Sequence, residues 1–126
     1  LGTARGENRV EGPTLAPDQW ALDGAWTREA ERAVLTGPDG AIRYRFRGRD
    51  VHLVLASTTG QPIRFRVTIN GQPPGEAAGA DVSASGEGTI RDQRLYQLIR
   101  LPTAGEGELK IEFLGPGAAA YAFTFG

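Results

Sequence analysis

The chain contains no cysteine and no methionine, and it has a single histidine among its 126 residues. The absence of cysteine excludes disulfide bonds, thiol redox chemistry and zinc–thiolate sites. Apolar runs are short: residues 51–56 form one of the longest, and this run is far below the length that spans a bilayer. The sequence therefore predicts no transmembrane segment, no metal centre and no bound cofactor within this chain.

Neither sign of charge dominates, because 14 basic residues are matched by 15 acidic ones and the net charge is −1. No overall field draws such a chain to nucleic acid or to an anionic membrane. The 18 glycines and 8 prolines stand between alternating segments and mark turns rather than disorder. The length fits one domain. Because the chain begins at Leu1 without a methionine, we expect it to be a piece of a longer protein.

Two segments between residues 41 and 71 alternate apolar and polar side chains. Successive side chains of a strand point to opposite faces, so each segment buries one face and exposes the other. This pattern predicts antiparallel sheet with one solvated side. The buried face is Ile42, Tyr44 and Phe46 in the first segment and Ile63, Phe65, Val67 and Ile69 in the second; the arginines between them are Arg43, Arg45, Arg47, Arg64 and Arg66.

Turn residues divide the rest of the chain into short strands. Residues 1–17 are predicted to be a linker or irregular lead-in, and residues 18–126 a single β-sandwich domain. We expect tight turns at Asp23-Gly24, at residues 37–40 and at Asn70-Gly71. Eight to ten short strands with regular turns predict an all-β, antiparallel sandwich of the jelly-roll type. The expected strands include residues 33–36, 42–47, 51–56, 63–69, 80–82, 88–90, 95–101, 109–114 and 120–125.

Catalytic chemistry has few candidates. His52 is either a general base or a structural histidine, and an Asp–His–Ser cluster with Ser57 would favour the first interpretation. A glycosidase needs two carboxylates at a fixed separation, and the sequence shows no such spacing. We therefore predict that this chain is not an enzyme by itself. The carboxylates considered for catalysis are Asp50, Asp81, Glu87, Asp92 and Glu112, and those considered for a structural calcium ion are Asp81 and Asp92.

Two features indicate ligand binding. If the strands 42–47 and 63–69 are neighbours, their arginines form a basic stripe for carboxylate or phosphate groups; otherwise they are a solvated outer face. Large aromatic residues either stack on sugar rings or fill the core. The candidate stacking residues are Trp20, Trp26 and Tyr96, and the candidate polar contacts are Arg45, Arg66, Gln97 and Arg100.

Several motifs resemble the C-terminal region of DipZ-type thioredoxin-like proteins, over nearly the whole chain. In that family a thioredoxin-like domain, in some members preceded by cytochrome c biogenesis-type membrane helices, is followed by a β-sandwich similar to a carbohydrate-binding module or galactose-binding-like domain. The motifs are Gln19-Trp20-Ala21-Leu22, Trp26-Thr27, Arg49-Asp50-Val51-His52-Leu53-Val54, Arg64-Phe65-Arg66-Val67, Gly71-Gln72-Pro73-Pro74-Gly75, Arg94-Leu95-Tyr96-Gln97-Leu98-Ile99-Arg100 and Ala122-Phe123-Thr124-Phe125-Gly126.

The resemblance implies a non-catalytic accessory domain of a thiol–disulfide oxidoreductase, because the redox Cys-x-x-Cys of the family belongs to the preceding domain. It implies an extracytoplasmic location in the periplasm or cell envelope, with a membrane tether supplied by the parent protein. The expected partner is carbohydrate of the envelope, including anionic glycan. The alternative is an assembly domain that packs on its own thioredoxin-like domain or on a partner protein.

Overall fold

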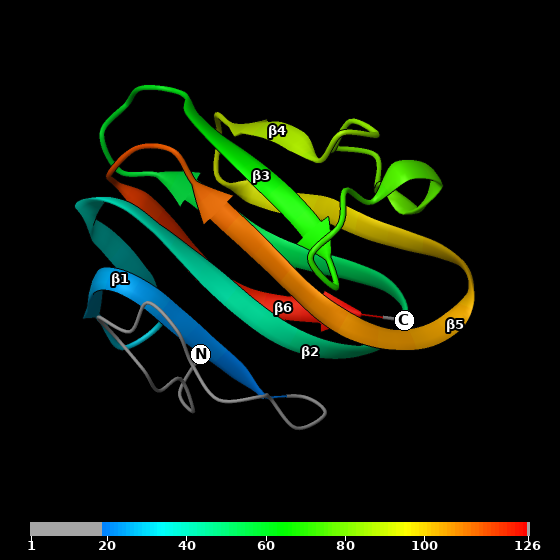
Figure 1. The fold of residues 1–126 in the computed structure, drawn as a ribbon. Helices are drawn as coiled ribbons and strands as arrows, with labels where there is room; N and C mark the ends of the chain where they lie inside the picture. Colours follow the sequence, from blue (N-terminus) through cyan, green and yellow to red (C-terminus); the bar gives the residue numbers. More distant parts are fainter. Residues whose placement is uncertain (1–18, 126) are drawn as a thin grey trace.

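The structure, a computed structural model, describes residues 19–125 and the side chains of residues 19–121. It has six strands and one short 3₁₀ helix in this range, shown in Figure 1. The predicted lead-in of residues 1–17 lies outside the described residues. The elements are β1 (Trp20–Arg28), β2 (Ala33–Ser57), β3 (Ile63–Ile69), η1 (Gly75–Ala77), β4 (Glu87–Ile90), β5 (Arg94–Phe113) and β6 (Ala118–Phe125).

The strands form two layers that are joined by their longest members. We call the front sheet the layer in which β1, the middle of β2, the second half of β5, β3 and β4 pair in that order. The back sheet contains the end of β2, the first half of β5 and β6. In Figure 1 the front sheet faces the viewer and β6 lies behind it. All pairings between named strands are antiparallel, so the predicted antiparallel sandwich is confirmed.

β2 and β5 pass from one sheet to the other without ending. The sequence predicted separate strands at 42–47 and 51–56, interrupted at residues 48–50, and separate strands at 95–101 and 109–114, interrupted at residues 102–108. Both predictions are wrong, because Gly48 has a φ of 141° and a bulge between Gly48 and Asp50 bends β2 sharply while its pairing with β5 continues. The number of separate strands is therefore smaller than predicted, and β2 and β5 also include residues 37–41, 48–50 and 102–108, which were predicted to lie between strands.

The two Asp-Gly dipeptides also differ from prediction. Neither Asp23-Gly24 nor Asp39-Gly40 ends a strand; Gly24 pairs with Gly40 inside the β1–β2 ladder, next to a bulge. Gly24 has a φ of 98°, which kinks the strand without reversing it. Asn70-Gly71 is a tight turn as predicted, with φ values of 51° and 82°. There the backbone groups of Ile69 and Gln72 are hydrogen-bonded to each other.

The core lies between the two sheets. Each sheet contributes the apolar residues of its alternating strands, as predicted for residues 42–46 and 63–67. The segment 80–82 is not a strand: Gly79 and Asp81 donate backbone hydrogen bonds to Leu98 and Gln97 at the edge of β5. No helix of the described residues has the length and apolar character needed to cross a membrane. Fully buried core residues include Phe46, Leu53, Leu55, Phe65, Tyr96, Leu98, Ile111 and Phe113.

Candidate functional site

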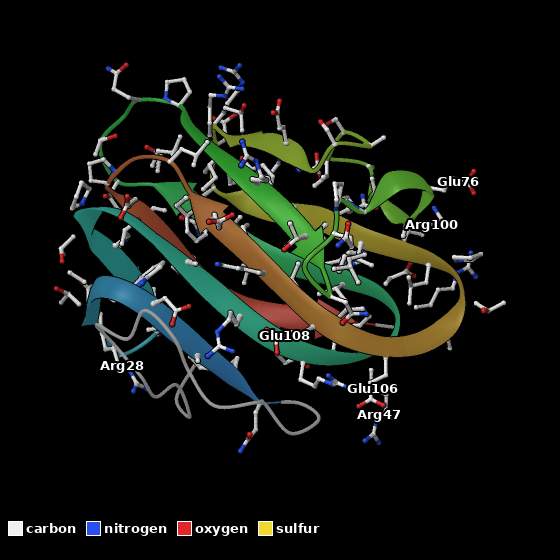
Figure 2. The ribbon with its side chains drawn as sticks, in the orientation of Figure 1. Arg28, Arg47, Glu76, Arg100, Glu106 and Glu108 are labelled. Carbon is white, nitrogen blue, oxygen red and sulfur yellow. The ribbon has the colours of Figure 1, made fainter. Side chains whose placement is uncertain are left out.

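The outer face of the front sheet carries charges of both signs. β5 lies between β2 and β3, so the strands 42–47 and 63–69 are not neighbours; the condition for a basic stripe is not met, and the alternative of a solvated outer face applies. β5 places acidic residues beside the arginines: Arg45 pairs with Glu106 and Arg66 stands opposite Glu112 in register. Figure 2 shows Arg47 near Glu106, its partner in register on β5. The face is therefore a charge-compensated surface and not a general anion-binding stripe.

One ion-pair network on this face is buried. Arg43 Nε lies 3.3 Å from Asp23 Oδ2, and Arg43 Nη1 lies 3.5 Å from Glu108 Oε2. Asp23 and Arg43 are both among the buried residues, which is unusual for charges on an outer sheet face. Because the guanidinium touches carboxylates from β1 and β5, the network holds three adjacent strands in a fixed arrangement.

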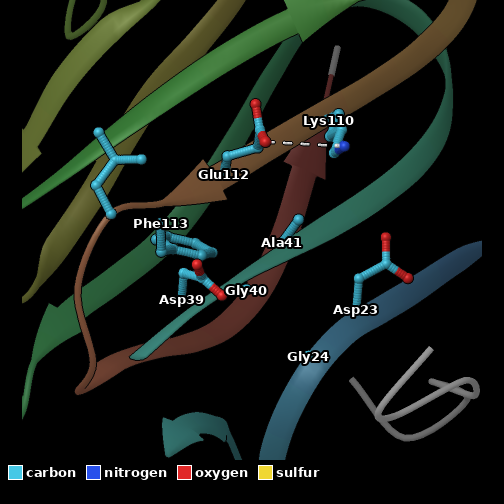
Figure 3. Close-up of a pocket in the computed structure, with 9 residues that line it drawn as sticks. Asp23, Gly24, Asp39, Gly40, Ala41, Lys110, Glu112 and Phe113 are labelled. Carbon is cyan, nitrogen blue, oxygen red and sulfur yellow. Dashed lines mark ion pairs between the residues drawn. The ribbon is translucent and has the colours of Figure 1, made fainter. Parts of the chain in front are cut away.

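A pocket of about 260 Å³ lies beside this network, across β1, β2 and β5 (Figure 3). We call it the acidic pocket, because three carboxylates line it, from Asp23, Asp39 and Glu112. Its one cation, Lys110, is 3.8 Å from Glu112 Oε2, and Figure 3 marks this ion pair. Carboxylate groups, which accept hydrogen bonds, thus line part of a hollow that is slightly smaller than most small-molecule sites.

Small residues keep this pocket open. Gly24, Gly40 and Ala41 line it where the β1 and β2 strands pair. A Cβ atom at Gly40 would lie 2.6 Å from Leu35 Cδ1, so no larger residue fits there without a shift of the core. The indole nitrogen of Trp26 donates a 2.8 Å hydrogen bond to the carbonyl of Asp23, which fixes the backbone at the kink.

A second pocket, of about 600 Å³, lies between the β2–β3 and β5–β6 turns. We call it the Arg64 pocket, because Arg64 is the one charged residue in its lining. Leu114 lines both pockets, and its side chain is 53% exposed. Its backbone N–H donates a hydrogen bond to the carbonyl of Arg64, so the two residues are neighbours. The remaining lining residues are Thr59, Gln61, Pro62, Ile63, Gly115 and Pro116.

Hydrogen bonds hold the walls of the Arg64 pocket. The backbone N–H and the hydroxyl of Thr58 both donate to the carbonyl of Gly117, at 2.9 and 2.7 Å, and so join the two turns. The Ser57 hydroxyl donates to the carbonyl of Gln61 at 2.6 Å, which closes the β2–β3 turn on itself. A Cβ atom at Gly117 would overlap the Thr59 side chain. The walls are therefore preformed, as ligand pockets usually are.

The sequence profile of the family described as "Thioredoxin like C-terminal domain" matches residues 4–126. This chain belongs to that family. No curated protein matches the chain in sequence. The predicted resemblance is thus confirmed at the level of the thioredoxin-like C-terminal domain, a family of accessory domains.

Solved structures resemble this thioredoxin-like C-terminal domain in fold. A family two carbohydrate esterase from Cellvibrio japonicus has a TM-score of 0.63 at 15% identity, over 84% of this chain and 30% of the esterase chain. A family two carbohydrate esterase from Clostridium thermocellum, in complex with cellohexaose, has a TM-score of 0.65 at 10% identity, over 86% and 31%. The domain spans less than a third of each esterase chain, and the likeness shows the sandwich fold.

The predicted stacking aromatics are core residues of the domain. Trp20, Trp26 and Tyr96 are 7%, 8% and 1% exposed. Trp26 packs edge-on against Phe113, with ring centroids 5.8 Å apart. The Tyr96 hydroxyl accepts a hydrogen bond from the Arg91 N–H and donates one to the carbonyl of Asp92. In this structure none of the three presents an open ring face to a ligand.

The predicted polar contacts do not gather in one place. Arg45 and Arg66 lie on the outer face of the front sheet, where β5 separates them. Gln97 lies on the back sheet, in register with His52. Arg100 is on β5 near η1 at one end of the sandwich (Figure 2), with Nε 4.0 Å from Asp50 Oδ1. Alternation along a strand predicts which face a residue shares, but not which strands are adjacent.

Sequence reasoning did not place Tyr121 in the site, yet among aromatic residues with described side chains it alone is partly exposed. It lies on β6 between Ala120 and Phe123, where the register with β2 shifts across the segment that contains Val54. Its hydroxyl accepts a 3.2 Å hydrogen bond from Arg32 Nη1. Val54 is in turn opposite Leu95, which is 38% exposed. This back-sheet patch (Val54, Leu95 and Tyr121) is a second, more apolar surface.

His52 and Ser57 do not form a catalytic pair in the structure. They are five residues apart on the extended strand β2, a distance of roughly 16 Å. The Ser57 hydroxyl is hydrogen-bonded within its own turn. Within the part of the chain that the structure describes, no group of three His, Asp or Glu residues is arranged to hold a metal ion.

On the back-sheet side, the fold lowers the pKa of Asp81. Arg94 Nη2 donates to Asp81 Oδ1 at 2.6 Å and Nη1 to Oδ2 at 3.2 Å, while the Gln97 N–H donates to Oδ2 at 2.7 Å. The hydrogen bonds from Arg94, and then that from Gln97, lower the pKa of Asp81 despite its partial burial. This carboxylate fastens the segment after η1 to β5, which is a structural role.

Proposed function

We propose that this domain is a non-catalytic accessory module of a DipZ-type thioredoxin-like thiol–disulfide oxidoreductase, and that it binds carbohydrate of the cell envelope. The ligand occupies the groove formed by the acidic pocket and the Arg64 pocket. The redox cysteines belong to another part of the parent protein, which acts outside the cytoplasm and holds the domain near the membrane. Binding raises the local concentration of the redox domain near its clients without any new contact to them.

The observation that carries the proposal is the exposed side chain of Leu114 between two pockets that combine apolar surface with a few polar side chains. A pyranose ring has an apolar C–H face and a rim of hydroxyl groups. Leu114 and the two neighbouring prolines, Pro62 and Pro116, offer surface for the apolar face. Carboxylates on one side of Leu114, and Gln61 and Arg64 on the other, offer partners for hydroxyl groups. The fold likeness to carbohydrate esterases, one solved with cellohexaose, adds an analogy at the level of fold.

The test is a titration of the chain with cellohexaose and with fragments of bacterial cell-wall glycan, followed by amide chemical shifts. We expect saturable shifts around Leu114, Gly115 and Ala41. Leu114→Ser is expected to weaken binding about tenfold, because burial of the leucine contributes roughly 1.5 kcal/mol. Leu95→Ser, which changes the other large exposed leucine, is the matched control and leaves affinity unchanged. A flat response to all glycans at millimolar concentration would refute carbohydrate binding.

The back-sheet patch favours a second candidate function, packing on the parent thioredoxin-like domain. Leu95 is exposed beside Val54, and Arg32 stands at the margin next to Tyr121. An apolar patch with a polar margin is typical of a protein contact. If this function holds, the separately added thioredoxin-like domain of the parent shifts the amides of Leu95 and Tyr121, and Leu95→Asp abolishes the effect. Shifts confined to the groove, or none, would exclude it.

A further inference from the structure

We infer that the Arg64 pocket is the subsite for a carboxylate-bearing sugar, and that the acidic pocket excludes that sugar, so that the groove binds acidic glycans in one orientation. This inference rests on the proposed carbohydrate function and names the ligand class of the same groove. The difference in charge between the two pockets, on the two sides of one leucine, carries it.

Arg64 is placed to accept a carboxylate. Its side chain is 67% exposed, and its ion pair with Glu87 is long, 3.5 Å from Nη2 to Oε1. Exposed ion pairs contribute little to stability, so a ligand carboxylate can replace Glu87 as the partner of Arg64 at little cost. A guanidinium binds a carboxylate through two parallel hydrogen bonds, which a sugar hydroxyl cannot reproduce. The pocket therefore distinguishes an acidic sugar from its neutral counterpart.

The remaining lining fits the rest of a sugar unit. Pro62, Pro116 and Leu114 supply apolar surface, and the side-chain amide of Gln61 offers both a donor and an acceptor. The volume, about 600 Å³, falls in the range of small-molecule sites. Because the two turns are joined through Thr58 and Gly117, the pocket exists before the ligand arrives.

The acidic pocket disfavours the carboxylate that the Arg64 pocket binds. Asp23 pairs with Arg43 and Glu112 pairs with Lys110, whereas Asp39 has no ion pair among the described residues, so the negative charge that remains disfavours an anionic group. Specificity arises as much from repulsion in the wrong place as from attraction in the right one. A glycan with a single carboxylate can therefore satisfy both pockets only when the carboxylate lies on the Arg64 side of Leu114.

Arg66 provides a matched control. It lies two residues beyond Arg64 on β3, so both side chains point outward from the front sheet, and both are exposed. Arg66 is opposite Glu112 and Glu87 in register and does not line the pocket. Replacement of either arginine by glutamine removes the same charge from the same strand. Only one of the two changes alters the proposed subsite.

The experiment compares glucuronosyl-glucose with cellobiose on the intact chain, by calorimetry and amide shifts at low salt. We expect the acidic disaccharide to bind about tenfold more tightly, with shifts at Arg64 and Gly115 from the acidic unit and at Ala41 from the neutral unit. The preference is expected to disappear in Arg64→Gln, to persist in Arg66→Gln and to decline as salt screens the charge. Thermal unfolding checks that both variants remain folded.

The outcomes distinguish failure of the acidic-sugar inference from failure of the proposed carbohydrate binding. If both disaccharides bind equally, or if the preference persists in Arg64→Gln, the inference is wrong while carbohydrate binding stands. If neither disaccharide binds and cellohexaose is also inert, the proposed function fails together with the inference. Tighter binding of the acidic disaccharide with shifts centred on the back-sheet patch would place the anion site elsewhere and overturn the assignment to Arg64.

Discussion

The outer faces of the two sheets are built partly from the same strands, yet they differ in chemistry. On the front sheet β2 and β5 present Arg43, Arg45, Glu106 and Glu108, which pair across the strands, and the face is hollowed at its end by two pockets. On the back sheet the same two strands present Val54 and Leu95, which are in direct register. One face suits a polar ligand and the other suits an apolar surface.

The bends in β2 and β5 separate two kinds of exposed surface as well as two layers. Before the bend, β2 alternates arginine with apolar residues; after it, the outward positions are His52 and Val54. A strand that ended at the bend would need a loop, and a loop would break the ladder between β2 and β5. The bulge at residues 48–50 changes the exposed chemistry while the pairing continues.

Among the changes that distinguish the two faces, Arg43→Met is expected to lower the free energy of unfolding most. This change keeps most of the side-chain volume but leaves the buried carboxylate of Asp23 beside an apolar group. Removal of one partner of a buried ion pair costs about 3 kcal/mol of unfolding free energy. Urea unfolding measures the loss. A loss as small as that of an exposed surface arginine would show that the front-face network does not hold the strands.

The second-largest loss of stability is expected for Asp81→Asn on the back-sheet side, and this loss depends on pH. Because Arg94 lowers the pKa of Asp81, the folded state binds that proton less readily than the unfolded state does. The stabilisation is therefore present above the ordinary aspartate pKa, near pH 4, and is lost as the pH falls through the lower folded-state pKa. Asp81→Asn is expected to cost about 1.5 kcal/mol at pH 7 and less below pH 4, by unfolding at each pH. A pH-independent difference would contradict the carboxylate role.

Tyr96→Phe tests whether a buried aromatic of the back sheet is structural. The change removes two hydrogen bonds, from the Arg91 N–H and to the carbonyl of Asp92, and is expected to cost about 1 kcal/mol of unfolding free energy. Glycan affinity remains unchanged because the ring faces the core. A selective loss of glycan affinity with wild-type stability would instead restore Tyr96 as a stacking residue.

The smallest effect is expected from Arg45→Gln, two residues from Arg43 on the same strand. Arg45 Nε is 3.2 Å from Glu106 Oε2, and both side chains are partly exposed. Such a pair contributes no more than about 0.5 kcal/mol. The same urea unfolding that detects the change at Arg43 should barely register this one. A comparable loss at both positions would mean that burial does not distinguish the two arginines.

The sequence was sufficient to predict the sandwich, because period-two alternation reports which face of a strand is buried. It placed Ile42, Phe46, Phe65 and Val67 in the core, where they are. It was not sufficient to order the strands, since nothing in residues 42–47 or 63–69 shows that β5 lies between them. The choice between an arginine stripe and a solvated outer face depended on that order, so it stayed open until the structure was known.

The pockets were harder to foresee. Asp23-Gly24 and Asp39-Gly40 have the composition of turns, and only tertiary pairing between the two glycines converts them into the lining of a pocket. The stacking hypothesis for Trp20 and Trp26 depended on a turn between them, and without that turn both rings point into the core. Leu114 was predicted to end a strand, but its exposure follows from the turn at residues 115–117, which alternation does not describe.

β2 has neighbours from both ends of the described chain: Ala33 pairs with Arg28 of β1 and also with Ala120 of β6. The backbone groups of β2 that pair with β6 therefore stay unpaired until β6, the last strand of the described residues, has been synthesised. Exposed strand edges of this kind recruit other chains. A chain that lacks residues 118–125 is therefore expected to expose this edge of β2 and to associate with other chains more readily than the intact domain.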